Sequence, residues 1–60
     1  MITSIFVKDL GNIELGQNRW NLGIVEKIEQ INETTYAVYV DGKIKSTYNI
    51  IYVVEVVFAA

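Results

Sequence analysis

Ile50-Ile51-Tyr52-Val53-Val54-Glu55-Val56-Val57-Phe58-Ala59-Ala60 is apolar at every position except Glu55. Because β-branched Ile and Val lose side-chain freedom in a helix and fit a pleated sheet, this composition predicts a strand over Ile50 to Phe58. Alternation along the strand places Ile51, Val53, Glu55 and Val57 on one face and leaves the other face wholly apolar. A strand with two apolar faces needs cover on both sides.

A chain of 60 residues forms a single domain, 1–60, with little material to cover such a strand twice. Small folds are usually stabilised by disulfides, a metal or a partner. The sequence has no Cys and no His, which excludes disulfides and ordinary zinc sites and leaves a partner. We therefore expect a homo-oligomer, most simply a twofold dimer, or a subunit of a larger protein complex. The predicted interface residues are Ile51, Val53, Glu55 and Val57.

The charge balance argues against a nucleic-acid partner. Five Lys and Arg against seven Asp and Glu give a net charge of −2, whereas a phosphate-backbone binder needs a surplus of cations. No basic segment followed by an apolar run stands at the N-terminus, and the C-terminal apolar run is too short to span a bilayer. Cytoplasmic location without membrane contact is the expectation.

The N-terminal third predicts one strand and one long loop. The strand is expected over Ile2 to Lys8, and the loop over Asp9 to Asn21, where glycines and asparagines gather. Ile13 and Leu15 are expected to point inward from this loop.

Leu22 to Ile31 is the second expected strand. Val25 and Ile28 are the residues of this strand that we expect to be buried. They are three apart and cannot share a face of a regular strand, so a bulge near Glu26-Lys27 is predicted. A helix is the alternative, because isoleucines also recur here at helical spacing. One glycine and several β-branched residues favour the strand.

Thr35 to Val40 and Lys43 to Asn49 flank Asp41-Gly42 and predict a hairpin. A three-residue bulged turn with Gly42 in the left-handed conformation would pair Tyr39 with Lys43 and Val38 with Ile44. This register separates apolar from polar residues better than a two-residue turn, and a buried face specifies register strongly. One face would then hold Tyr36, Val38, Ile44, Ser46 and Tyr48. Five short strands and a long first loop predict an all-β fold, a single small SH3-like barrel that is partly open.

Catalytic chemistry is poorly supplied, because without His or Cys only carboxylates, Lys, Tyr and hydroxyls are available. We predict no catalytic residues, no cofactor and no metal site, and interpret Glu26, Glu29 and Glu33 as a solvated edge. A candidate ligand or partner surface consists of Trp20, Tyr39, Lys43 and Lys45, where the aromatic rings could stack on a planar ligand or a base. The alternatives are a core lid for Trp20 and an ordinary cross-strand contact with lysine for Tyr39.

Two family resemblances follow from short motifs. Trp20-Asn21-Leu22-Gly23-Ile24-Val25, with Val53-Val54-Glu55-Val56, resembles the barrel of the photosystem I accessory subunit PsaE family, which implies a non-enzymatic subunit that helps dock ferredoxin through basic residues. Trp20, Ile24, Val25 and Tyr36-Ala37-Val38 resemble plasmid-borne type II dihydrofolate reductase, a tetramer of SH3-like barrels. Ser46 to Ile50 occupies the place of that family's Val-Gln-Ile-Tyr segment.

The sequence therefore predicts a non-enzymatic protein–protein interaction module that self-associates, or joins a larger complex, through its apolar C-terminal strand. One alternative is a pore-type oligomeric enzyme that binds a planar substrate through Tyr48, Asn49 and Tyr52. The other is a small nucleic-acid-binding barrel.

Overall fold

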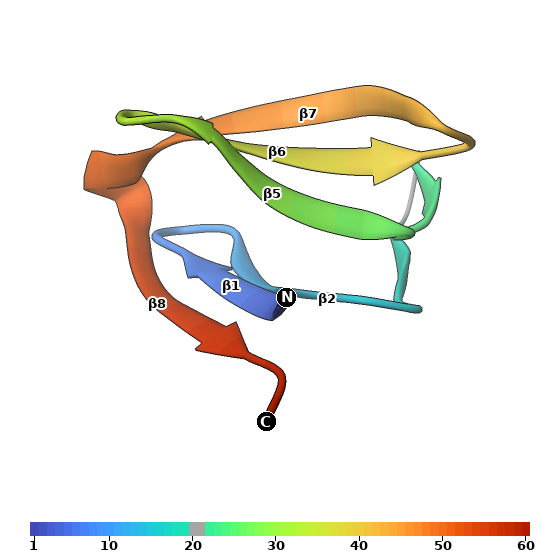
Figure 1. Cartoon of the computed structure of the whole chain (residues 1–60), viewed down its shortest axis with the longest axis horizontal. Helices are drawn as coiled ribbons and strands as arrows, with labels where there is room; N and C mark the ends of the chain where they lie inside the picture. The colour runs from blue at the N-terminus through green and yellow to red at the C-terminus, as the bar shows by residue number, and fades with distance from the viewer. Residues whose placement is uncertain (20–21) are drawn as a thin grey trace.

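The computed structural model describes residues 1–19 and 22–60, which form short strands and one 3-10 turn (Figure 1). The strands are β1 (Ile2–Val7), β2 (Gly11–Glu14), β3 (Asn18–Arg19), β4 (Gly23–Ile24), β5 (Lys27–Asn32), β6 (Thr35–Val40), β7 (Lys43–Asn49) and β8 (Val53–Phe58), and the turn is η1 (Ile50–Tyr52). The predicted all-β class is confirmed.

The strands form three small antiparallel sheets with the orders β2-β1-β8, β3-β4 and β5-β6-β7. Figure 1 shows the β5-β6-β7 sheet above β1 and β2, with β8 curving down one side. The three sheets do not close into a barrel, and the SH3-like resemblance stays a prediction.

The core lies between the two three-stranded sheets. It is built from apolar side chains on the facing surfaces, namely Ile2, Ile5, Val7, Ile13, Val25, Ile28, Tyr36 and Val38. Leu15 packs against this cluster from outside the regular strands. The inward placement predicted for Ile13 and Leu15 is therefore confirmed.

The prediction of a long loop over Asp9 to Asn21 is wrong, because this segment contains β2 and β3. The β1–β2 hairpin reverses direction at Asp9, whose φ is +67°, and the Leu10 N–H donates to the Val7 carbonyl at 3.1 Å. β2 is an outer strand that buries only Ile13, so its sequence lacks the apolar alternation that would have marked it. Trp20 lies outside the described residues.

The helix alternative for Leu22 to Ile31 is wrong, and Val25 and Ile28 are both buried as predicted. The bulge predicted near Glu26-Lys27 is not found; instead the expected strand is divided into β4 and β5, and the chain changes sheet between Val25 and Glu26. The Val25 N–H donates to the Gln17 carbonyl at 2.9 Å, whereas the next N–H, that of Glu26, donates to the Tyr39 carbonyl at 2.9 Å. The chain thus leaves the β3–β4 sheet and enters β5-β6-β7 at this point.

The predicted register of the hairpin, with Tyr39 opposite Lys43, is also wrong. Val40 pairs with Lys43 and Tyr39 with Ile44, so Asp41-Gly42 is a two-residue turn, with φ of +55° and +73°. An irregularity inside β7 then restores the predicted pairing face, because Val38 pairs with Ser46. Tyr36, Val38, Ser46 and Tyr48 share the inner side as predicted, but Ile44 does not. Two left-handed residues suit a tight hairpin, so the extra residue moves from the turn into the strand.

Candidate interaction surface

The apolar C-terminal segment begins with a 3-10 turn, so the strand predicted over Ile50 to Phe58 begins only at Val53. The Asn49 side chain caps this turn by accepting a hydrogen bond from the Ile51 N–H at 3.0 Å. An asparagine that bonds backbone two residues ahead competes locally with strand pairing. The chain therefore turns between β7 and β8 before it extends again.

Among the described residues β8 pairs with β1, and this pairing contains two irregularities, one between Ile2 and Ser4 and one between Phe6 and Val7. Val7 pairs with Val53, whereas its neighbour Phe6 pairs with Glu55, so Val54 is an extra residue on β8. The extra residue reverses the alternation, which puts Val53 on the side of buried Val7 and Glu55 on the side of exposed Phe6.

The predicted single face of Ile51, Val53, Glu55 and Val57 is therefore wrong. Val53 packs against the core of its own chain, as does Val56. Ile51, Glu55 and Val57 are exposed, and of the two apolar side chains Ile51 is the more exposed, at 74%.

A continuous part of the chain nevertheless leaves large apolar side chains in solvent. Val54 is 68% exposed and Phe58 64% exposed. We define the β8 surface as the exposed residues of η1 and β8 with their neighbour on β1: Phe6, Ile50, Ile51, Tyr52, Val54, Glu55, Val57 and Phe58. Phe6 was missed by the sequence analysis because its place beside Glu55 depends on the β1–β8 register.

β8 also has a free backbone edge, since it is an outer strand of its sheet among the described residues. The Ala59 N–H donates to the Met1 carbonyl at 2.8 Å, which brackets the pair of Ile2 and Phe58. In an antiparallel ladder, residues bracketed in this way direct their own N–H and C=O groups away from each other. The N–H and C=O of Phe58 thus point away from β1, at the free edge of β8.

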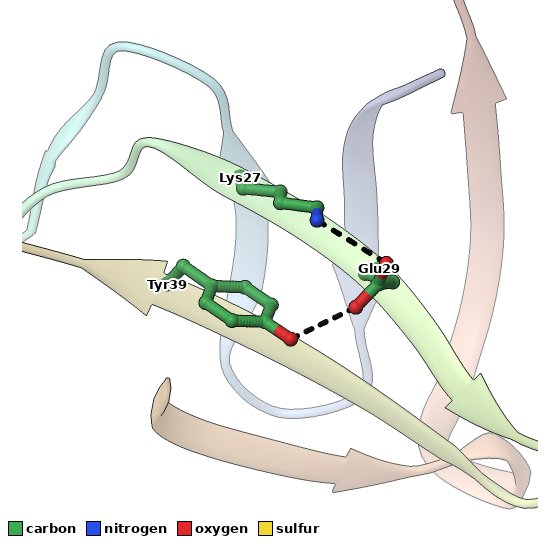
Figure 2. A network of polar contacts seen from close by, with 3 residues as sticks. All are labelled: Lys27, Glu29 and Tyr39. Carbon is green, nitrogen blue, oxygen red and sulfur yellow. Dashed lines mark hydrogen bonds and ion pairs between the residues drawn. The ribbon is translucent and has the colours of Figure 1, made fainter. Parts of the chain in front are cut away.

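A second candidate group lies on the outer side of β5 and β6 (Figure 2). The Tyr39 hydroxyl donates to Glu29 Oε1 at 2.8 Å, and Lys27 Nζ lies 3.2 Å from Glu29 Oε2. Lys27 Nζ also lies 5.2 Å from the centroid of the Tyr39 ring, a cation–π distance.

These contacts shift two proton affinities in opposite directions. The hydrogen bond from Tyr39, followed by the contact with Lys27, lowers the pKa of Glu29 below its ordinary value. The same hydrogen bond raises the pKa of Tyr39, because losing the phenolic proton would put two negative charges together. A phenol held protonated is a poor base or nucleophile, so the group is best explained as a cross-strand structural contact. The interpretation of Glu29 as part of a merely solvated edge is thus incomplete.

Of the candidate ligand surface of Trp20, Tyr39, Lys43 and Lys45, Trp20 lies outside the described residues, and the structure places Tyr39 and Lys43 on different faces. Tyr39 pairs with Lys27 and Ile44, whereas Lys43 pairs with Val40, so Lys43 belongs to the opposite face of the hairpin. Lys45 lies at the irregularity in β7.

The three residues of the pore-type alternative have different places in the fold. Tyr48 packs against the core and Asn49 caps η1. Tyr52 is exposed.

A groove of about 460 Å³ lies where β5 passes the N-terminus and the end of β8. Its lining is apolar at Met1, Ile2, Leu15, Ile28 and Phe58, and polar at Glu26, Lys27, Glu29 and Gln30. Glu26 is already engaged, because its Oε1 accepts the Gly42 N–H at 2.8 Å. The sequence analysis missed this groove because its walls come from segments far apart along the chain.

Among the described residues, no three Asp or Glu side chains gather closely enough to hold a metal ion. Nor do these residues form a helix long and apolar enough to cross a bilayer. Comparison with known proteins finds no matching family model, no matching curated protein and no matching solved structure.

Proposed function

We propose that this chain is a non-enzymatic, cytoplasmic protein–protein interaction module that self-associates through the β8 surface, most simply as a dimer. The observation that carries this proposal is the coincidence of exposed apolar side chains with a free strand edge on β8. Contiguous apolar surface on a small protein usually marks an interaction site.

A comparison of the outer strands supports β8 as the site. β5 carries Lys27 and Glu29, and β7 carries Lys43 and Lys45. Charges on an edge strand hinder indiscriminate pairing. β2 carries Glu14 among four residues, whereas β8 has the single charge Glu55 among six, so the edge of β8 is the least protected in the two three-stranded sheets.

Burial of this surface would supply the driving force, at about 25 cal/mol per Å² of apolar area removed from water. Ile51, Val54 and Phe58 would contribute most, since these apolar side chains are the most exposed of the surface. Val53 and Val56 would act indirectly, because they anchor β8 to the core and keep the surface in place.

Sedimentation equilibrium of the unmodified chain at tens of micromolar tests the proposal. We expect a mass that is a multiple of 6.8 kDa. Val54→Asp should shift the protein to monomer while its circular dichroism spectrum stays that of a folded β protein, because Val54 is exposed in the single chain.

Ile24→Asp is the matched control, since Ile24 is half exposed but lies on β4, outside the β8 surface. It should leave the mass unchanged. A single species of 6.8 kDa for the unmodified chain would refute self-association.

A further inference from the structure

We propose that the β8 edge of one copy docks against the β7 edge of a second copy, with Glu55 facing Lys43 and Lys45. This inference rests on the self-association proposed above and names the surface that receives β8. It is carried by the charges and by the two free edges.

Glu55 is an exposed carboxylate among apolar neighbours on the β8 surface. Within residues 1–19 and 22–60, the ion pair formed is Lys27 with Glu29, so Glu55 has no cationic partner in its own chain there. A carboxylate inside an interface is tolerated when it is paired and costs free energy when it is not. The surface that receives β8 must therefore supply a cation.

β7 supplies both a cation and an apolar contact. Lys43 and Lys45 are exposed at its start, and Ile44 between them is 47% exposed because the register turns it away from the inner side. The sequence Lys43-Ile44-Lys45 thus complements Val54-Glu55, with charge opposite charge and an apolar side chain available beside it. β7 is an outer strand of its sheet, as β8 is of its own.

Pairing of β8 with a second β8 is less favourable. The midpoint of the strand Val53–Phe58 lies between Glu55 and Val56, so a centred twofold pairing sets each Glu55 opposite Val56 of the other copy. Each carboxylate would then have no cation opposite it inside the interface, which costs free energy. Docking of β8 on β7 gives Glu55 a lysine partner, and in a twofold dimer the contact forms twice.

Charge exchange tests the inference. Glu55→Lys should weaken the association constant about tenfold, since attraction becomes repulsion, and the double variant Lys43→Glu/Lys45→Glu should weaken it similarly. The triple variant that combines all three changes should recover most of the affinity. Glu14→Lys is the control, because Glu14 is exposed on β2, which β1 separates from β8, and its reversal should leave the association unchanged.

Dissociation constants would be measured by sedimentation velocity, with circular dichroism melts to confirm folding of each variant. Added NaCl should weaken the unmodified assembly, because salt screens the attraction between opposite charges. An assembly that Val54→Asp dissociates, but that neither lysine reversal nor salt weakens, would overturn docking on β7 and leave the proposed self-association standing. Failure of the triple variant to recover affinity while it remains folded would also overturn it. A monomeric unmodified chain would refute both proposals.

Discussion

Gly23→Ala is expected to be the most destabilising single-methyl change in this chain. Gly23 has φ of +111°, and a Cβ at this position would lie 2.9 Å from Cγ1 of Val40. Val40 is 1% exposed, so its side chain has little room to yield. The substitution thus combines an unfavourable backbone conformation with overpacking of a buried side chain.

The two contributions can be estimated separately. A left-handed conformation costs an alanine about 1–2 kcal/mol. Overpacking by an extra carbon costs about 1–3 kcal/mol. The sum is about 2–5 kcal/mol, which is a large share of the roughly 3–9 kcal/mol expected for a domain of this size.

Gly11→Ala isolates the backbone contribution, because Gly11 has φ of +100° and open space where its Cβ would be. Urea unfolding followed by circular dichroism, at one protein concentration for all variants, measures both losses. We expect Gly23→Ala to lose more stability than Gly11→Ala by the overpacking contribution. Equal losses would refute the close packing of Gly23 against Val40.

The Val40→Ala background provides a second check. Truncation of Val40 removes the carbon that the new methyl group would meet, so Gly23→Ala should cost less there than in the unmodified chain. An undiminished cost would mean that the strain does not arise at this contact.

Three further predictions concern the hairpin, the polar group and β8. Gly42→Ala should cost about 1 kcal/mol, because Gly42 is left-handed in the two-residue turn, and an unchanged urea midpoint would contradict this turn. Because the pKa of Glu29 is lowered in the folded chain, its contacts stabilise the fold above pH 4.5, and this stabilisation is lost as the pH falls through the folded pKa. Because the pKa of Tyr39 is raised, its hydrogen bond stabilises the fold below pH 10.0, and this stabilisation is lost as the pH rises through the folded pKa. Tyr39→Phe should therefore return the pKa of Glu29 toward 4.5 in an NMR titration, and an unmoved titration would exclude the hydrogen bond between them. Val53→Asp should unfold the monomer, with a loss of about 3 kcal/mol, because Val53 packs against the core, and a folded monomeric variant would contradict that packing.

Local chemistry in the sequence determined the strand character and the position of the Asp41-Gly42 turn. β-branched residues and the Asp41-Gly42 dipeptide predict an all-β chain with a hairpin at this point, and the structure contains both. The burial of Val25 and Ile28 was also predicted from the sequence. Since two residues three apart cannot share a face of a regular strand, their burial required a break in the strand between them.

Register was decided by the tertiary structure. One extra residue moves every following side chain to the other face, so the positions of irregularities determine which apolar residues are exposed. Those positions depend on contacts between segments distant in sequence. Glu26 accepts the Gly42 N–H at the hairpin tip, and the Lys8 N–H donates to the Tyr52 carbonyl at 2.7 Å near the extra residue on β8.

The β8 surface shows the consequence for function. The apolar C-terminal segment predicted an interface, but alternation alone could not tell that Val53 faces the core while Val54 and Phe58 face solvent. That distinction arises because β8 pairs with β1 through an irregular ladder and has no second neighbour among the described residues. A strand's composition sets how much apolar surface it carries, whereas its pairing with other strands sets which side of that surface remains exposed.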